Sequence, residues 1–63
     1  MKSLVNNYLN GNLATARKQA RRFTHAAIRA ALQDELGYSE HKAALTADYL
    51  KTGDGFQAAC DAE

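Results

Sequence analysis

The longest uninterrupted helical pattern in the chain is NLATARKQARRFTHAAIRAALQDELG, residues 12–37. Asn12 is a favoured residue before a helix, Gly37 is the residue type that most often ends one, and neither Pro nor Gly interrupts the residues between them. Apolar side chains recur every three or four positions, as on one helical face: Leu13, Ala16, Ala20, Phe23, Ala27 and Ala30. The pattern predicts one long central helix over residues 13–36. A break at Thr24 is the alternative, because Thr24 could cap a second helix.

Shorter helical patterns lie on both sides of this segment. The residues from Ser3 to Leu9 carry an apolar face and stop at the turn signal Asn10-Gly11. Another helix is expected to begin after Ser39, which can cap it, and to end before Gly53. The chain should therefore contain helices and turns but no strands.

The last residues predict a short final helix. Asp54 is a candidate cap for it, and Phe56, Ala59 and Cys60 are expected to point inward. Phe56 would then close the core. The alternative is that Phe56 anchors a partner or a second copy of the chain, because aromatic residues often dominate interface energies.

These segments predict a compact all-α domain of three to four helices over residues 1–63. Thirteen of the 63 residues are Ala and large apolar residues are few, so the core should be thin, and a homodimer would stabilise it. The chain has no apolar run of about 18 residues, no secretory signal near Met1 and a single cysteine. We expect a cytoplasmic protein that does not contact membranes.

The formal net charge of +1 hides a division of charge along the chain. Residues 1–29 contain six basic and no acidic residues, whereas residues 30–63 contain seven acidic residues and two lysines. On a helix with about 100° between residues, five of the basic residues fall opposite the apolar stripe. These predicted binding residues are Arg17, Lys18, Arg21, Arg22 and Arg29.

Three interpretations of this basic face stay open. It can bind the phosphates of nucleic acid, because arginine forks pair with phosphate oxygens and displaced counterions favour binding. It can dock as a module or inhibitor on an acidic protein surface. It can also be solvated, or paired with the acidic half of the chain. Phe23 is the only aromatic residue within the cluster and faces the apolar side, which argues against base stacking.

The stretch ALQDELGYSEHKAAL, residues 31–45, resembles the helix-turn-helix of small DNA-binding domains carried by phages and plasmids. Leu32 and Leu36 precede a Gly turn, and the small residue Ala43 follows in the second helix. The resemblance implies secondary contacts to nucleic acid from His41 and Lys42. The second helix departs from the pattern because its exposed residues are of mixed charge, and a plain helical hairpin is the alternative.

The whole chain resembles small all-helical accessory proteins of plasmids, phages and integrated elements. The likeness rests on its size, on YLNGNL at residues 8–13 and on FQAACDAE at residues 56–63. It implies partners in a host defence or gene-control system and no particular activity.

The sequence contains no spacing of residues that is typical of a catalytic or metal-binding site. His25 and His41 lack metal-ligand spacing, and Cys60 has no assignable base. The short, acidic segment Thr52–Gly55 does not resemble a phosphate loop. We expect a non-enzymatic protein with no metal and no cofactor, and favour a nucleic-acid contact as its function.

Overall fold

Five helices and no strands make up the computed structural model, which describes residues 1–63 and places 75% of them in helices. The helices are α1 (Lys2–Leu9), α2 (Leu13–Ala20), α3 (His25–Leu36), α4 (Glu40–Thr52) and α5 (Phe56–Asp61). The predicted all-α class is confirmed, whereas the number of helices exceeds the expected three to four. None of the helices has the length and apolar character that crossing a bilayer requires.

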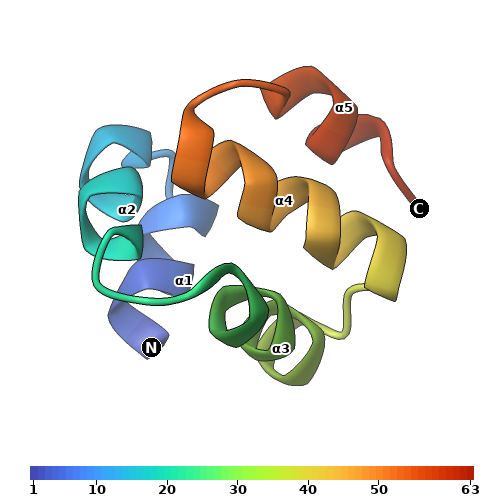
Figure 1. Cartoon of the computed structure of the whole chain (residues 1–63), viewed down its shortest axis with the longest axis horizontal. Helices are drawn as coiled ribbons and strands as arrows, with labels where there is room; N and C mark the ends of the chain where they lie inside the picture. The colour runs from blue at the N-terminus through green and yellow to red at the C-terminus, as the bar shows by residue number, and fades with distance from the viewer.

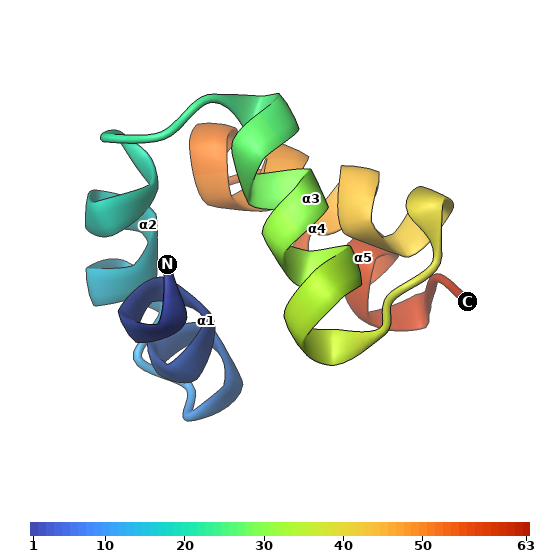
Figure 2. The ribbon, with the colours of Figure 1, turned by 90° about the horizontal axis from the view of Figure 1, so that it is seen from below.

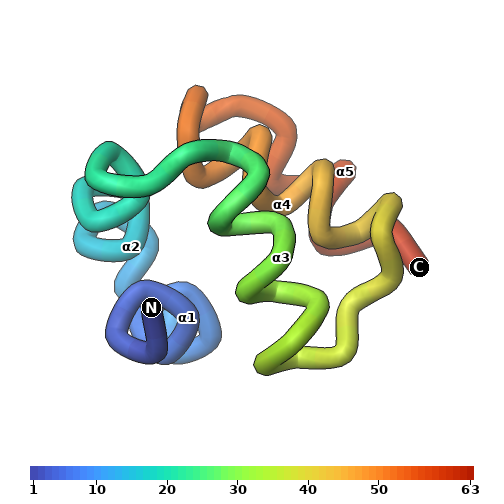
Figure 3. Tube along the Cα trace, turned by 60° about the horizontal axis from the view of Figure 1, so that its bottom comes forward, coloured from blue at the N-terminus to red at the C-terminus, as the bar shows by residue number.

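The prediction of one long helix over residues 13–36 is wrong. The chain breaks at an elbow, residues 21–24, between α2 and α3, as the alternative at Thr24 anticipates (Figure 3). Thr24 Oγ1 accepts a hydrogen bond from the N–H of Ala27 at 3.1 Å, and Lys51 Nζ donates to the carbonyl oxygens of Ala20 at 3.3 Å and Phe23 at 2.7 Å. These contacts satisfy backbone groups that the break releases.

The size of the core explains why the break occurs. An unbroken helix of these residues would measure about 36 Å at about 1.5 Å per residue. The longest extent of the folded Cα trace is 24 Å. The elbow lets Ala16 and Ala20 of α2 and Ile28 and Leu32 of α3 enter the same small core.

The central helix is α4. It lies between α3 and α5 in Figure 1 and also packs against α2. Ser39 caps it as predicted, because its Oγ accepts the N–H of Lys42 at 3.1 Å, and Gly53 ends it in the left-handed conformation. It contributes five buried residues: Ala43, Thr46, Ala47, Tyr49 and Leu50.

Helices α1 and α2 form a hairpin at one side of the molecule, away from α5 (Figure 2). The predicted turn at Asn10-Gly11 joins them, with Gly11 at a φ of +82°. Gln19 bridges the pair: its Nε2 donates to Ser3 Oγ at 2.9 Å, and its Oε1 accepts from Asn7 Nδ2 at 3.1 Å. The hairpin therefore holds the orientation of α2 by side-chain hydrogen bonds as well as by apolar contact.

The core is thin and rich in alanine, as the composition predicts. Four of its ten residues are Ala, so it contains little large apolar surface. The ten residues are Leu4, Val5, Ala16, Ala20, Ile28, Leu32, Ala43, Ala47, Tyr49 and Leu50.

The final helix differs from its prediction in three residues. Gly55, and not Asp54, precedes α5, and no side chain caps it. Ala59 is buried as expected, but Phe56 is 40% exposed and Cys60 is exposed. Of the six residues of α5 only Ala59 is buried, and Phe56 and Cys60 lie outside the hydrophobic core cluster.

Candidate functional site

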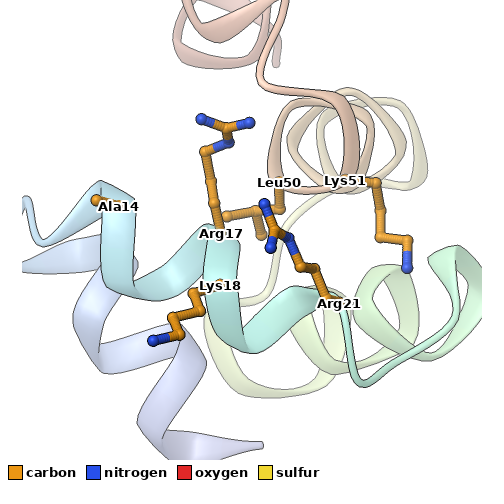
Figure 4. Close-up of a pocket in the computed structure, with 6 residues that line it drawn as sticks. All are labelled: Ala14, Arg17, Lys18, Arg21, Leu50 and Lys51. Atoms are coloured by element: carbon orange, nitrogen blue, oxygen red, sulfur yellow. The ribbon is translucent and has the colours of Figure 1, made fainter.

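An open pocket of about 330 Å³ lies between α2 and the C-terminal end of α4 (Figure 4). Four of its six lining residues are cations and none is acidic. We call it the basic pocket; its residues are Ala14, Arg17, Lys18, Arg21, Leu50 and Lys51. It combines three of the five predicted binding residues with a lysine and an apolar floor from another helix.

The side chains of the pocket point in different directions. Figure 4 shows Arg17 and Arg21 directed from α2 toward the end of α4, whereas Lys18 points away from them. The ammonium of Lys51 is used by the elbow, where it bonds two carbonyl oxygens. Arg17 and Arg21 are therefore the groups best placed to bind an anion in the pocket, and Lys18 and Lys51 add positive charge at its edges.

Arg17 is half-buried, and its surroundings hold it without neutralising it. Its Cζ lies 6.0 Å from the centroid of the Tyr49 ring, in the range of a cation–π contact. Its buried Nε has no hydrogen-bond partner. Gly53 lies directly against the guanidinium, since a Cβ built at Gly53 would clash with Nη2 of Arg17. The guanidinium thus lies between a ring and a glycine, and its buried Nε is unpaired.

The other predicted cations of the basic face lie elsewhere. Arg22 lines a second, smaller pocket with Met1, Ser3, Leu4, Gln19 and Phe23. Arg29 is on α3, beyond the elbow, and is half-buried. The single face of five cations expected on one long helix is therefore divided, because the elbow turns α3 away from α2.

The predicted secondary contacts occupy the opposite end of α4. Lys42 Nζ donates to the carbonyl oxygens of Ala59 at 3.2 Å, Cys60 at 3.4 Å and Ala62 at 3.2 Å, and lies 5.0 Å from the Tyr38 ring centroid. We call this arrangement the Lys42 clamp. It commits the ammonium to the end of α5 and leaves only His41 exposed. The two predicted groups of binding residues do not form one surface.

The arginines and lysines of the chain do not form ion pairs with its acidic residues. The only ion pair joins His25 Nε2 to Asp48 Oδ1 at 2.7 Å, and no lysine or arginine lies within 4.0 Å of a carboxylate oxygen. Direct ion pairing of the basic face with the acidic residues, one of the interpretations that the sequence left open, is therefore not seen. The cations of the basic pocket have no carboxylate partner within the fold.

An aromatic row adjoins the pocket, and the sequence did not predict it. The Tyr8 and Tyr49 ring centroids are 6.5 Å apart, and those of Tyr49 and Phe56 are 5.0 Å apart. The row runs from half-buried Tyr8, whose pKa is raised chiefly by burial, to exposed Phe56. Tyr49 approaches Arg17 because α4 packs on α2, and Phe56 joins the row because α5 packs on α4; no local spacing in the sequence signals either contact.

The sequence did not identify Lys51 as a pocket residue, because a lysine in the last turn of a helix is an ordinary helix-end signal. No group of three or more His, Cys, Asp or Glu side chains comes together as a metal ligand set. No family model matches the chain, and no similar curated protein or solved structure is found.

Proposed function

We propose that this protein binds nucleic acid, as a non-enzymatic accessory protein, through phosphate contacts in the basic pocket. The observation that carries the proposal is an open pocket that Arg17 and Arg21 line with no carboxylate, and at whose edges Lys18 and Lys51 add positive charge. Guanidinium forks pair with phosphate through two parallel hydrogen bonds, and each neutralised phosphate releases counterions.

The absence of competing acids within the fold supports this function. The chain has seven carboxylate side chains, yet none is within 4.0 Å of an arginine or lysine. An anion that enters the pocket would not have to displace an internal partner. The proposal also includes the accessory role in a mobile element that the sequence resemblance implies.

The test is a salt titration of binding to random-sequence DNA and RNA, followed by fluorescence anisotropy. Arg21→Gln should weaken binding to all sequences and lower the slope of log K against log salt by about one unit. Arg22→Gln is the matched control, since it removes the same charge from the adjacent residue, which lines the other pocket. Lack of binding at low salt would refute the proposal, and equal effects of the two variants would refute the assignment to this pocket.

An acidic protein surface is the alternative partner, because carboxylates fit the same guanidinium forks. The half-buried Arg17 and the apolar floor at Leu50 favour a shaped contact of this kind. Affinity capture from lysate with and without nuclease separates the two. A partner that survives nuclease, binds with fixed stoichiometry and is lost in Arg21→Glu would establish the protein-binding function instead.

A further inference from the structure

Phe56 is the exposed end of the aromatic row and one of three large apolar side chains at the surface. It is 40% exposed, and its ring leans on Tyr49 at 5.0 Å between centroids with an interplanar angle of 59°. Gly55, at a φ of +84°, sets the chain direction just before it. The ring is therefore held by a buried aromatic neighbour while part of it faces solvent.

The same Tyr49 ring connects Phe56 with the basic pocket. Arg17 Cζ lies 6.0 Å from the Tyr49 centroid, so Arg17 and the Phe56 ring are at most about 11 Å apart. This upper limit is about three nucleotides along a stacked strand at about 3.4 Å each. A base of a strand whose phosphate lies at Arg17 is thus within reach of Phe56.

We propose that Phe56 is a base-stacking residue, and that the site takes single-stranded nucleic acid. This inference rests on the proposed function and specifies its substrate. In a duplex the faces of the bases are covered by their neighbours, whereas a single strand can offer a base to an exposed ring. Cations that follow the backbone beside an aromatic platform are the usual combination in proteins that bind single strands.

The structure removes the sequence-based argument against stacking. That argument considered only Phe23, which packs against the core. The stacking ring comes instead from α5, more than thirty residues later in the chain. Its place beside Arg17 follows from the packing of α5 on α4 and of α4 on α2.

Anisotropy titrations with four labelled ligands of equal length test the proposal: oligothymidylate, oligouridylate, a DNA duplex and an abasic strand that keeps the phosphates. The two strands with bases should bind more tightly than the abasic strand and the duplex. Phe56→Leu should weaken their binding about tenfold, within the range measured for loss of base stacking, and leave the abasic strand nearly unchanged. The oligothymidylate and oligouridylate arms separate DNA from RNA as the source of the strand.

A spectroscopic variant gives an independent readout. The chain has no Trp, so Phe56→Trp introduces a single indole. Its fluorescence should be quenched by oligothymidylate and not by the abasic strand. Leu9→Ala, which changes a 55% exposed apolar residue outside the aromatic row, is the control for loss of surface apolar area. Circular dichroism confirms that each variant keeps its helices.

The outcomes distinguish this inference from the proposed function. Tight, base-dependent binding that Phe56→Leu weakens supports both. Equal binding of the abasic strand and the two strands with bases, unaffected by Phe56→Leu, overturns base stacking and leaves phosphate binding intact. Failure of every ligand to bind at low salt overturns both.

Discussion

The cations at the two ends of α4 have different hydrogen-bond partners. At the N-terminal end, the Lys42 clamp gives one ammonium three backbone carbonyl acceptors. At the C-terminal end, Arg17 and Arg21 line a pocket without a carboxylate, and Arg17 Nε has no acceptor. The sequence indicated the cations at both ends as candidate contacts. Lys42 instead holds the end of α5 against α4, whereas Arg17 and Arg21 remain without a carboxylate partner.

This difference shows that the acceptors around a cation, more than its position on a helix, decide its role. Carbonyl oxygens at a helix C-terminus are unpaired and carry partial negative charge, so a nearby lysine is drawn to them. The end of α5 supplies such carbonyls to Lys42, and the elbow supplies them to Lys51. No comparable acceptors reach Arg21.

Replacing the floor of the basic pocket should have the largest effect. Leu50 is 1% exposed and belongs to the core, so Leu50→Ala should lower the free energy of unfolding by about 2–5 kcal/mol. Leu9→Ala makes the same change at a 55% exposed position and should stay within about 0.5 kcal/mol of the wild type. Urea denaturation followed by circular dichroism measures both. Similar losses in the two variants would show that the pocket floor is not part of the core.

Removing the ammonium of the Lys42 clamp should have the next largest effect on stability. Lys42→Met should cost about 2 kcal/mol, because three carbonyl acceptors lose a charged donor. Hydrogen exchange should rise first in α5. Arg21→Met should change stability by less than about 0.5 kcal/mol while it weakens nucleic-acid binding. A loss of stability in Arg21→Met together with a loss of binding in Lys42→Met would contradict the different roles assigned to the two ends of α4.

A pair of glycine substitutions separates backbone strain from disturbance of Arg17. Gly53 and Gly11 have φ values of +85° and +82°, so alanine at either should cost about 1 kcal/mol. A Cβ at Gly53 meets the Arg17 guanidinium, whereas a Cβ at Gly11 meets nothing within 4 Å. Denaturation should therefore give similar losses, and anisotropy should show weaker binding only for Gly53→Ala. Equal binding by both variants would contradict the placement of Arg17.

The smallest effect concerns Tyr8, the half-buried end of the aromatic row. Burial raises the pKa of Tyr8, so above pH of about 10 the unfolded chain loses this proton more readily than the folded one. The free energy of unfolding should fall as pH rises through that range, and the fall should be shallower in Tyr8→Phe. Burial also raises the pKa of Tyr38, so some of the fall should persist. Identical pH profiles for wild type and Tyr8→Phe would argue against the burial of Tyr8.

Local signals predicted most of the helix ends but not the division of the longest segment. Ser39, Gly37 and Gly53 act as their residue types suggest, because caps depend on neighbours within one turn. The elbow contains Arg21, Arg22 and Phe23, none of which breaks helices. Its long-range hydrogen bonds come from Lys51 on another helix, and periodicity cannot show that.

The charge distribution along the sequence predicted part of the candidate site, and the packing of the helices adds the rest. The charge asymmetry identified Arg17, Lys18 and Arg21, which the structure places together. Arg22 and Arg29 were grouped with them only through the assumption of one continuous helix. Lys51, Tyr49 and Phe56 enter through the packing of α4 on α2 and of α5 on α4, which single-helix patterns do not encode.

The hydrogen bonds from Lys51 to the elbow also affect when the basic pocket forms during synthesis. Lys51 is 31 residues after Ala20 and 28 after Phe23, so the elbow lacks the Lys51 contact until α4 has emerged and docked. The floor of the basic pocket, Leu50, arrives in the same step. A nascent or partly unfolded chain therefore displays the full set of basic charges without the cavity that organises them.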